Sequence, residues 1–442
     1  METRVCNVRG WSELRSTMLA GSWAGFLAFL CLVIGVTCHS SKFAIVGDSH
    51  LLLNYDPNAP IKHIHCRGNG SVEAANEYGK YGCDTPVILF NATLNSMLHV
   101  IPDPDFIVYI GDFVAHHTKT QDEVYQNMAR TAQMLRDAYP KTLVFPLLGN
   151  EDFFPDYIST AGDSWFTKIA TNLYPELLGV SDTFKVGGYY SHLLPGSSNK
   201  LLVLNTVLYS RENPAAANES DPGGQLEWLK WQLEDAQSSG YKVFLFGHIP
   251  TGVREDSHHD QWHKHFSDAF VALIVKYAPV ISSTFFGHTH RSSFRFYSTG
   301  HCSPLKKVEM YSIMIGAVSP IRYNNPSFTT ISYDLNSMAL HDYAVYNASI
   351  DSSEFSEGYS FMKFFENSGT KITLASMQTL WDDFLVDKHD RKTMYHLRNL
   401  GGPGDRPYGK ATFLCGLSCH NTHDHNDCLN YFQATERAND TM

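Results

Sequence analysis

Five short apolar segments of this chain each end in a glycine that is followed at once by a side chain able to bind a metal ion. The segments are rich in β-branched and aromatic residues and do not alternate with polar ones, which favours strands buried on both faces. Side chains that follow neighbouring parallel strands lie together at one edge of a sheet. The five motifs are Gly47-Asp48-Ser49-His50, Gly111-Asp112, Gly149-Asn150, Gly247-His248 and Gly287-His288-Thr289-His290.

The residue types in these motifs suit a site for two metal ions. Two cations about 3.5–4 Å apart need a bridging carboxylate, imidazole and carboxylate or amide ligands, and open positions for water and substrate. Asp112 is the expected bridge because it is the lone carboxylate between the Asp-x-His motif and Asn150. His288 and His290 are spaced by one residue, so a short loop can direct one imidazole at each cation. A single Asp or His at a strand end is usually a cap, whereas five in series predict a binuclear site.

The order of these motifs resembles that of the calcineurin-like metallophosphoesterases, and finer matches are similar to their acid sphingomyelinase-like phosphodiesterase branch. The similarity extends over about residues 42–334. Endopolyphosphatases of the same superfamily share several segments, including Cys66-Arg67-Gly68 and Asn213-Pro214, so both substrate classes stay open. The finer matches are Tyr81-Gly82-Cys83-Asp84-Thr85-Pro86, Val186-Gly187-Gly188-Tyr189-Tyr190-Ser191, Leu204-Asn205-Thr206, Asp221-Pro222 and Gln225-Leu226-Glu227-Trp228-Leu229.

The resemblance implies two divalent metal ions, zinc in these families, and a ligand for every position. It also implies a histidine near the substrate phosphate, four residues after the bridging aspartate, which is His116 here. The other interpretation of His116 is a solvated loop histidine. One metal is expected to bind Asp48, His50, Asp112 and His290, and the other Asp112, Asn150, His248 and His288.

One catalytic position departs from the family pattern. The family has Gly-Asn-His at the third motif, with that histidine placed to stabilise the phosphoryl group or protonate the leaving oxygen, whereas this chain has Glu151 after Asn150. Nearby cations lower the pKa of a carboxyl and favour its ionised form, which repels a phosphate. Endopolyphosphatase-like sequences also lack this histidine, so its loss does not by itself predict inactivity. Glu151 is therefore retained as a candidate catalytic residue.

The fold class expected from these patterns is α/β. Strands are expected at 43–47, 106–110, 143–148, 201–206, 243–247, 282–287, 309–317 and 328–333, and helices at 121–138, 224–239 and 265–277. These elements and the resemblance predict a two-sheet metallophosphoesterase sandwich flanked by helices. The expected domains are 1–38 for targeting, 40–340 for catalysis, and 341–442, a small and mostly helical C-terminal domain that becomes helical from about residue 352.

An uncharged, mainly apolar run of 21 residues at 18–38 follows three arginines. It is expected to be either a signal peptide or an uncleaved signal anchor. Both alternatives place the catalytic domain outside the cytosol, because the arginines stay on the cytoplasmic side. The chain is thus expected in the secretory pathway, either secreted, in the lumen of an acidic compartment, or anchored as a type II membrane protein through this segment alone.

Six of the nine cysteines lie beyond the targeting segment, an even number that suits disulfides. The resemblance suggests Cys66 with Cys83 and Cys415 with Cys419, which leaves Cys302 as the default partner of Cys428. Five Asn-x-Ser/Thr sequons are compatible with a glycosylated lumenal chain. They lie at Asn69, Asn91, Asn218, Asn347 and Asn439.

A net charge of −11 argues against binding to DNA or RNA, because no basic face is available to displace counterions. The expected function is metal-dependent hydrolysis of phosphoester or phosphoanhydride bonds in a small phosphorylated substrate, such as a phosphodiester, a nucleotide or polyphosphate. The competing hypothesis is a catalytically impaired relative that keeps its metals. Two further histidine groups are interpreted as solvated loops, namely His258, His259, His263 and His265, and His420, His423 and His425.

Overall fold

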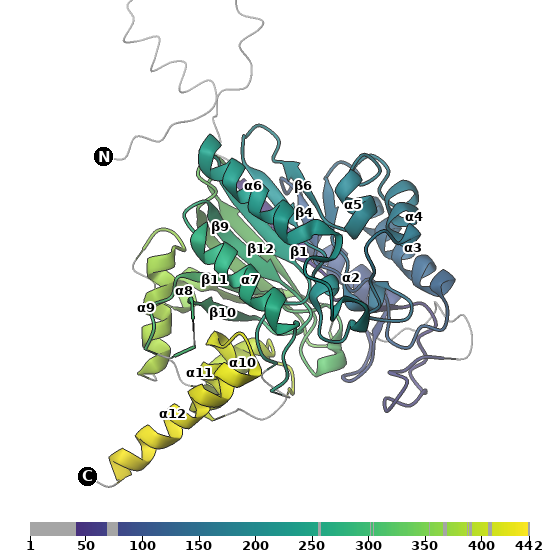
Figure 1. Cartoon of the computed structure of the whole chain (residues 1–442). Helices are drawn as coiled ribbons and strands as arrows, with labels where there is room; N and C mark the ends of the chain where they lie inside the picture. The colour runs from purple at the N-terminus through teal and green to yellow at the C-terminus, as the bar shows by residue number, and fades with distance from the viewer. Residues whose placement is uncertain are drawn as a thin grey trace, which may run out of the picture. The chain divides into compact units, whose positions relative to one another are not determined.

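Two six-stranded β-sheets packed face to face form the centre of the protein, as the computed structural model shows (Figure 1). In the first sheet the order is β14 (Ser356–Ser360), β13 (Leu340–Asn347), β12 (Ser327–Tyr333), β1 (Ser41–Val46), β4 (Ile107–Tyr109) and β5 (Val144–Pro146). In the second the order is β10 (Ser293–Tyr297), β11 (Met310–Met314), β9 (Ile281–Phe286), β8 (Val243–Gly247), β7 (Lys200–Val203) and β6 (Tyr190–Leu193). A short pair, β2 (Leu51–Leu52) and β3 (Thr85–Pro86), stands apart.

The structure describes most of the chain after the first forty residues. The apolar run at 18–38 and the sequon at Asn69 lie outside the described residues. The described part from Lys42 onward forms one compact unit. The described ranges are 41–68, 78–254, 258–300, 302–303, 305–352, 354–365, 369–386, 388, 391–404 and 409–440.

A cluster of aromatic side chains joins the two sheets. Phe43 of β1 lies with its ring centroid 5.5 Å from that of Phe244 in β8 and 6.0 Å from that of Phe285 in β9. Tyr333 of β12 packs 5.5 Å from Phe43 and 5.7 Å from Phe244. All four side chains are buried. Truncating one such aromatic costs about 3–5 kcal/mol, so the cluster holds the inner faces of the sheets in a fixed relation.

The central strands run parallel, so their carboxyl ends lie at the same edge. Strand β4 pairs in parallel with both β1 and β5, and β8 pairs in parallel with both β7 and β9. The eight strands expected from apolar runs are all present, as β1, β4, β5, β7, β8, β9, β11 and β12. Strands β6, β10, β13 and β14 and the short pair β2 and β3 were not expected. Strands β6, β13 and β14 are partly exposed and mixed in sequence, whereas β10 is buried but has Arg295 among its apolar residues.

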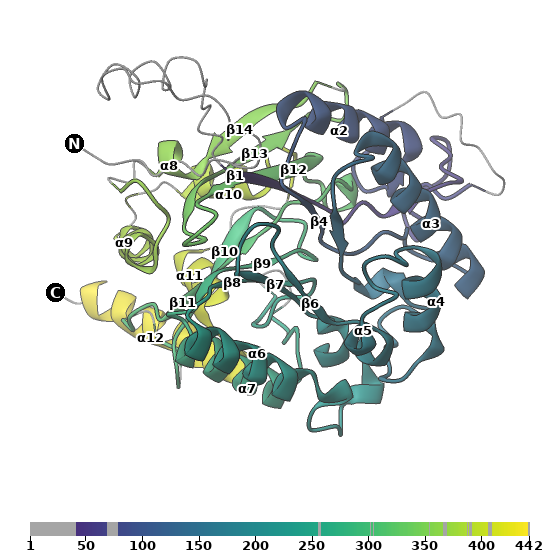
Figure 2. The same cartoon turned by 90° about the horizontal axis from the view of Figure 1, so that it is seen from above.

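Helices cover the outer faces of both sheets, and Figure 2 shows α2 and α3 beside the first sheet and α6 and α7 beside the second. The three expected helices are confirmed as α3, α6 and α7. A local signal sets the start of α3, where the Thr120 hydroxyl accepts the Glu123 N–H at 3.1 Å. The helices are α2 (Val87–Val100), α3 (Gln121–Ala138), α4 (Ser164–Asn172), α5 (Asp182–Gly187), α6 (Gln225–Ser239), α7 (Lys264–Lys276), α8 (Phe361–Phe364), α9 (Leu374–Leu385), α10 (Arg391–Arg398), α11 (Lys410–Ser418) and α12 (Thr422–Asp440).

Beyond residue 340 the chain first extends the first sheet and then becomes helical. Strand β13 pairs antiparallel with β12, and β14 pairs antiparallel with β13. The helical part therefore starts at Phe361, later than the expected start near residue 352, because residues 356–360 pair with β13. Trp381 of α9 packs on Phe296 of β10 with ring centroids 5.2 Å apart. A separate C-terminal domain at 341–442 stays a prediction.

Two of the three expected disulfides are wrong. Cys66 pairs with Cys83 as expected, but Cys302 pairs with Cys419 and Cys415 pairs with Cys428. Cys415 lies within α11. Cys419 is the C-cap residue of α11 and has an extended backbone, so the two cysteines are not on one face of a continuous helix. The turn between α11 and α12 instead brings Cys428 to Cys415.

The expectation that the C-terminal histidines are solvated is wrong for two of them. His425 is fully buried and His420 is 7% exposed, whereas His423 is exposed. His420 stacks on Tyr297 with ring centroids 5.4 Å apart, and its Nε2 lies 3.2 Å from the Ser298 carbonyl oxygen. In the histidine group that follows the fourth motif, His258, His259 and His265 are exposed to solvent as expected, whereas His263 is only partly exposed.

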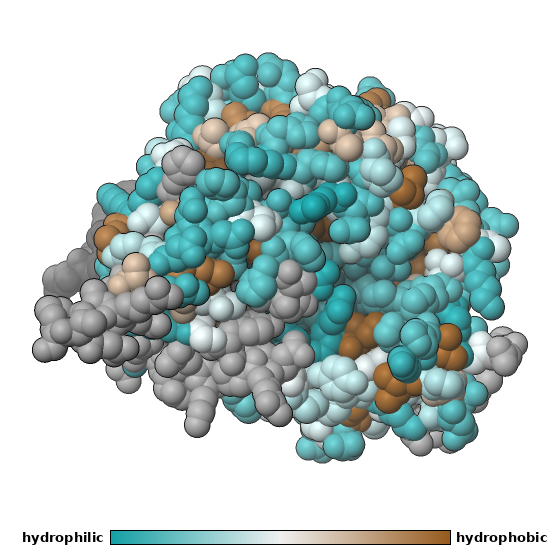
Figure 3. Space-filling view, turned by 60° about the horizontal axis from the view of Figure 1, so that its bottom comes forward, coloured by the Kyte–Doolittle hydropathy of each residue, from teal (hydrophilic) through white to brown (hydrophobic). Residues whose placement is uncertain are grey.

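The surface is mostly hydrophilic on the face that Figure 3 shows, and its hydrophobic residues lie in small groups. Large hydrophobic side chains with high exposure include Val180, Val386 and Leu305, which are far apart in the sequence. Scattered residues of this kind are normal for a folded chain. Among the residues that the structure describes, none of the helices combines the length and apolar character that a bilayer crossing needs.

The disulfides are expected to differ in their contribution to stability. Cys302–Cys419 closes a loop of 117 residues and Cys415–Cys428 one of 13. Because a longer closed loop restricts the unfolded chain more, Cys302→Ala/Cys419→Ala should lower the free energy of unfolding by about 2–5 kcal/mol, and more than Cys415→Ala/Cys428→Ala does. Denaturant unfolding measures both values. A Cys302–Cys428 peptide in a non-reducing digest would contradict the pairing itself.

Candidate metal centre

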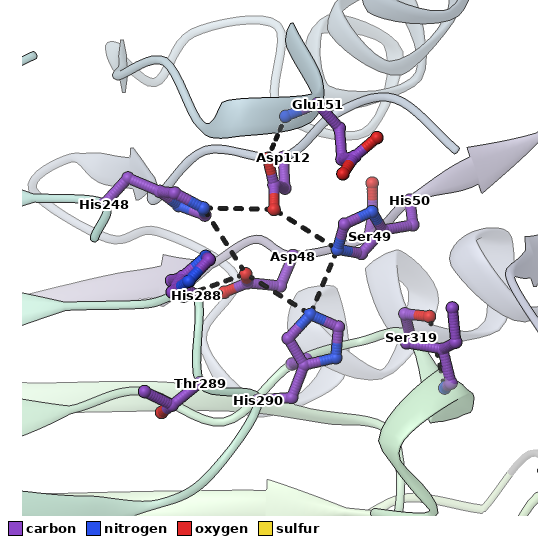
Figure 4. A network of polar contacts seen from close by, with 12 residues as sticks. Asp48, Ser49, His50, Asp112, Glu151, His248, His288, Thr289, His290 and Ser319 are labelled. Carbon is purple, nitrogen blue, oxygen red and sulfur yellow. Dashed lines mark hydrogen bonds and ion pairs between the residues drawn. The ribbon is translucent and has the colours of Figure 1, made fainter. Parts of the chain in front are cut away.

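Seven side chains from both sheets converge at the carboxyl edge of the sandwich. Asp48 follows β1, Asp112 follows β4 and Asn150 follows β5, all in the first sheet. His248 follows β8 and the His288 to His290 loop follows β9, in the second sheet. Figure 4 shows the imidazoles of His248, His288, His290 and His50 and the carboxylates of Asp48 and Asp112 pointing toward one another. The structure thus brings six of the seven expected side chains together in two groups, and Asn150 lies in the segment that follows β5 beside them.

The backbone around these side chains is unusual. Five of the seven have positive φ angles, a region that non-glycine residues rarely adopt. Such residues cost about 1–3 kcal/mol each and gather at functional sites. The glycine in each motif is required because neighbouring atoms leave no room for a side chain. A Cβ on Gly111 (φ 93°) would lie 2.6 Å from His248 Nδ1, and one on Gly149 would overlap Asp112 Oδ1. The five are Asp48, His50, Asp112, His288 and His290.

The first group of donors is Asp48, His50 and His290, whose ligand atoms lie within 4.8 Å of one another. His50 Nε2 and His290 Nε2 are 3.0 Å apart, and His290 Nε2 is 3.6 Å from Asp48 Oδ1. The Val114 carbonyl oxygen lies 3.0 Å from His50 Nδ1. A hydrogen bond to that carbonyl fixes the tautomer and leaves the Nε2 lone pair free for a cation.

The second group is Asp112, His248 and His288, and Asp112 lies between the two groups. Asp112 Oδ2 is 3.0 Å from His248 Nε2 and 3.4 Å from His50 Nε2. The other oxygen, Oδ1, accepts the Glu151 N–H at 2.9 Å. His248 Nδ1 donates to the Ile110 carbonyl oxygen at 2.7 Å, so its Nε2 also faces the centre. One carboxylate oxygen therefore faces donors of both groups.

Asn150 completes the second group and provides a test of whether metal ions fit. Its Nδ2 donates to Glu151 Oε1 at 3.0 Å, while its Oδ1 is buried without a hydrogen-bond partner among the described residues. A buried polar oxygen without a partner is costly. A cation bound by Asn150 Oδ1 removes that cost, so the residues present fit the metals.

The charges at the site also require cations. Burial, with a smaller contribution from Asp112, raises the pKa of Asp48 to about 7. Burial alone would lower the pKa of His248, but Asp112 and Asp48 outweigh it and raise that pKa to about 10. Burial lowers the pKa of His50 to about 4, which keeps its imidazole neutral and able to bind a metal. Two buried carboxylates thus favour positive charge between them, and divalent cations supply it.

His116 lies beside the donor groups and is held by a residue that the sequence did not single out. Its Nδ1 lies 2.8 Å from Asp84 Oδ1, and its ring stacks on that of His50 with centroids 4.3 Å apart. Burial would lower the pKa of His116, but Asp84 and then Glu151 outweigh it and raise that pKa to about 9. At 20% exposure and paired with Asp84, His116 is not a solvated loop histidine.

Glu151 occupies the position beyond Asn150 and faces His116. Its Oε1 lies 3.8 Å from His116 Nε2, and its side chain is 7% exposed. Burial raises the pKa of Glu151 to about 8, although the positive charge of His116 opposes that change. The Glu151 carboxyl thus lies between the Asn150 amide, which donates to it at 3.0 Å, and the His116 ring.

Asp152 is a further residue that the sequence reasoning missed. Its buried carboxylate accepts the N–H groups of Asp112 and Phe113 at 3.0 and 2.8 Å and that of Gly149 at 2.8 Å. It therefore joins the second and third motifs and orients the bridge candidate from behind. The sequence feature that could have identified Asp152 is its position two residues after Asn150. For Asp84 it is the Cys-Asp-Thr-Pro segment.

Comparisons with known proteins agree with this geometry. The family described as calcineurin-like phosphoesterase matches residues 41–292. Acid sphingomyelinase-like phosphodiesterase 3b of Homo sapiens is 31% identical over 341 residues, which are 73% of this chain and 74% of that protein. Cyclic GMP-AMP phosphodiesterase of Homo sapiens is 29% identical over 327 residues, 69% of this chain and 70% of that protein.

One further relative and one solved structure were also matched. Sphingomyelinase phosphodiesterase C of Dictyostelium discoideum is 28% identical over 72% of this chain and 75% of that protein. A crystal structure of a dimetal phosphatase from Danio rerio matches with a TM-score of 0.45 and 13% identity, over 72% of this chain and 98% of that one. The family match extends over more than half of the chain and includes every donor from Asp48 to His290. The chain belongs to the calcineurin-like phosphoesterase family and is a metal-dependent phosphoester hydrolase.

Proposed function

We propose that the enzyme hydrolyses phosphodiesters of small molecules with two zinc ions at the carboxyl edge of its sheets. The observation that supports this most directly is Asp112, whose Oδ2 faces His50 and His248 from the two donor groups. One zinc ion is assigned to Asp48, His50, Asp112 and His290, and the other to Asp112, Asn150, His248 and His288.

Zinc is the metal that suits this donor set best. Four imidazoles, two carboxylates and one amide oxygen are nitrogen and oxygen ligands of intermediate softness, which zinc accepts in open catalytic sites. Magnesium and calcium prefer sites made of oxygen ligands alone. Manganese or iron in the purified protein would contradict zinc but leave the reaction class unchanged.

Each residue near the donors has a separate task in the proposed reaction. When bound, the two cations supply an activated water and neutralise charge on the phosphoryl group. The carbonyls of Val114 and Ile110 fix the tautomers of His50 and His248. His116 presents its Nε2 beside the donors and supplies a proton or a hydrogen bond to the phosphoryl group or the leaving oxygen.

The phosphodiester class is inferred from the relatives and from the charge of the molecule. Curated relatives include an acid sphingomyelinase-like phosphodiesterase and a cyclic GMP-AMP phosphodiesterase. Both names specify a phosphodiester, and neither specifies a polyphosphate. A net charge of −11 disfavours a long polyanion such as polyphosphate or nucleic acid, which needs a basic surface.

One observation favours a second candidate, namely that this chain is a catalytically impaired member of the family that keeps its metals. Glu151 stands where the family has a histidine, and an ionised carboxylate there repels the phosphate. Its pKa of about 8, which burial raises, keeps the carboxyl neutral at acid pH. A neutral carboxyl can donate a hydrogen bond to a phosphoryl oxygen, so an acidic compartment favours an active enzyme.

The secretory pathway is the proposed location. The three disulfides fit an oxidising compartment. The apolar run at 18–38 would direct the chain there as a signal peptide or a signal anchor. Asn91 and Asn218 are exposed and can accept glycans, whereas Asn347 donates its amide to the Leu400 carbonyl oxygen at 2.6 Å and is partly buried.

The bridge assignment predicts the metal content of a variant. Asp112→Asn removes the charge that faces both cations, so the metal content should fall from about two ions per chain to one or none. Activity should be lost while circular dichroism still shows a folded chain. Mass spectrometry of the metals measures the content, and Asp103→Asn, an exposed aspartate, is the control. Two ions per chain in Asp112→Asn would refute the bridge.

The Glu151 assignment predicts how the rate depends on pH and on substitution. Burial raises the pKa of Glu151 to about 8 and bound cations lower it again, so the carboxyl loses its proton as pH rises from acid toward neutral, and kcat should fall over that range. A group in this role is worth about 10²–10⁴-fold in rate. Glu151→His should therefore raise kcat if the wild-type carboxylate impairs the site, and lower it if Glu151 is an adapted acid.

The control for that experiment is a matched change at an exposed site. Glu176→His makes the same substitution away from the donors, and it should leave kcat unchanged. Glu151→Gln separates the two interpretations further, because an amide cannot transfer a proton. Equal rates for wild type, Glu151→His and Glu151→Gln would show that position 151 has no part in the chemistry.

The glycan assignment predicts a change in apparent mass. Asn91→Gln and Asn218→Gln should each remove one glycan and shift the gel mobility of the secreted protein by one step, because both side chains are exposed. Asn347→Gln should cause no shift. Glycosidase treatment that leaves the mobility of the wild-type protein unchanged would contradict the proposed location.

A further inference from the structure

A groove lies between α2 and the turn that precedes β14, and its lining includes none of the metal donors. Its volume is about 440 Å³, which is within the range of about 300–1,000 Å³ that ligand-binding clefts occupy. Asn91 of α2 is exposed, lines this groove and begins the sequon Asn91-Ala92-Thr93. A glycan on Asn91 would therefore start at the wall of the groove.

Helix α2 presents two rows of side chains to the groove, and the first row is partly buried. Residues four apart lie on one face of a helix, so the members of this row follow one another along the groove. The row is small or apolar, and the short side chains at its middle leave space for a ligand. It consists of Ile88, Ala92, Ser96 and Val100.

The second row is polar and exposed, and it consists of Asn91, Asn95 and His99. The side chains of Asn95, His99 and Ser96 make no hydrogen bond to any other residue that the structure describes. An amide, an imidazole and a hydroxyl can each donate and accept hydrogen bonds. One side of the groove thus offers polar groups to a ligand beside a mainly apolar strip.

The opposite wall of the groove carries an aromatic ring. Phe355, directly before β14, lines the groove and is partly buried. Phe328 of β12 supports this ring with centroids 5.7 Å apart, and Phe328 in turn stacks on Tyr346 at 5.2 Å. A ring fixed in this way offers a flat apolar surface that loses little freedom when a ligand packs on it.

We infer that this groove binds the first sugars of the N-linked glycan on Asn91, with a sugar ring against Phe355 and its polar groups beside Asn95 and His99. A sugar ring has apolar C–H faces and a polar edge, which match the two kinds of surface in the groove. Because the glycan is tethered at the groove wall, its docking is intramolecular and has a high effective concentration. The inference rests on the proposed glycan and does not depend on phosphodiester hydrolysis.

The alternative is a glycan on Asn91 that extends freely into solvent. Endoglycosidase H cleaves between the first two sugars, so it can cut a docked glycan only in the fraction of molecules whose groove is empty. A free glycan is cut at the rate of other surface glycans. Asn218 provides that reference rate, because it is exposed, follows the turn at η3 (Pro214–Ala216) and does not line the groove.

The test measures how fast each glycan is cut from the native secreted protein. The protein is produced in cells that attach oligomannose glycans, treated with endoglycosidase H and sampled over time, and mass spectrometry of the glycopeptides gives the rate at each site. Phe355→Ala removes the aromatic surface, and Ser96→Arg fills the groove from the partly buried row. The control is Tyr431→Ala, which removes an aromatic ring from the surface of α12 outside the groove.

The cut at Asn91 should be about tenfold slower than the cut at Asn218, which corresponds to about nine glycans in ten being docked. Phe355→Ala and Ser96→Arg should each bring the rate at Asn91 close to that at Asn218, and Tyr431→Ala should not. In denatured protein the two rates should be equal. Equal rates in the native wild type, or slow cleavage at Asn91 that persists in Ser96→Arg, would overturn the inference.

Thermal unfolding gives a second readout, because a glycan that docks only in the folded state stabilises that state. Asn91→Gln should lower Tm by about 2 °C, Asn218→Gln should leave Tm unchanged, and Asn91→Gln should cause no further loss in the Ser96→Arg background. An Asn91 found without a glycan would overturn the inference and leave the proposed hydrolysis intact. An inactive protein whose Asn91 glycan is cut slowly would refute the hydrolysis and support the inference.

Discussion

Two carboxylates buried side by side, Asp48 and Asp112, set the electrostatic condition of the whole active edge. Neither is more than 1% exposed, and burial with the charge of Asp112 raises the pKa of Asp48 to about 7. Paired buried charges need compensation nearby, because water cannot solvate them. Four imidazoles lie beside this pair, and the Asn150 Oδ1 atom nearby has no hydrogen-bond partner among the described residues. A pair of divalent cations would satisfy these groups, which gives a physical reason for so polar a cluster at the end of an apolar core.

The sandwich makes this cluster possible because it fixes two sheets that contribute different donors. Phe43 and Tyr333 of one sheet pack against Phe244 and Phe285 of the other, so the ends of β1 and β4 face those of β8 and β9. The core also supports the unfavourable backbone at the donors, where positive φ angles cost about 1–3 kcal/mol each.

A second layer of residues controls the chemistry around the donors. Asp152 orients the loop of Asp112 from behind, and Asp84 holds His116 at its side. Glu151 changes the family pattern directly after Asn150, and its proximity to His116 links the two positions electrostatically. Substituting one member of this group therefore alters the proton affinity of its neighbour, so rates at position 151 are best interpreted together with those at His116.

The sequence by itself determined the local features: the buried strands, the helices α3, α6 and α7, and donors placed after glycines at strand ends. These follow from periodicity, capping and close approach, which act over a few residues. Only the tertiary structure decided the pairing of Cys302 with Cys419, the addition of β13 and β14 to the first sheet, the burial of His425 and the contact between Asp84 and His116. The disulfide and the Asp84 contact join residues distant in sequence, whereas β13 and β14 pair with strands near them in sequence but lack an apolar pattern.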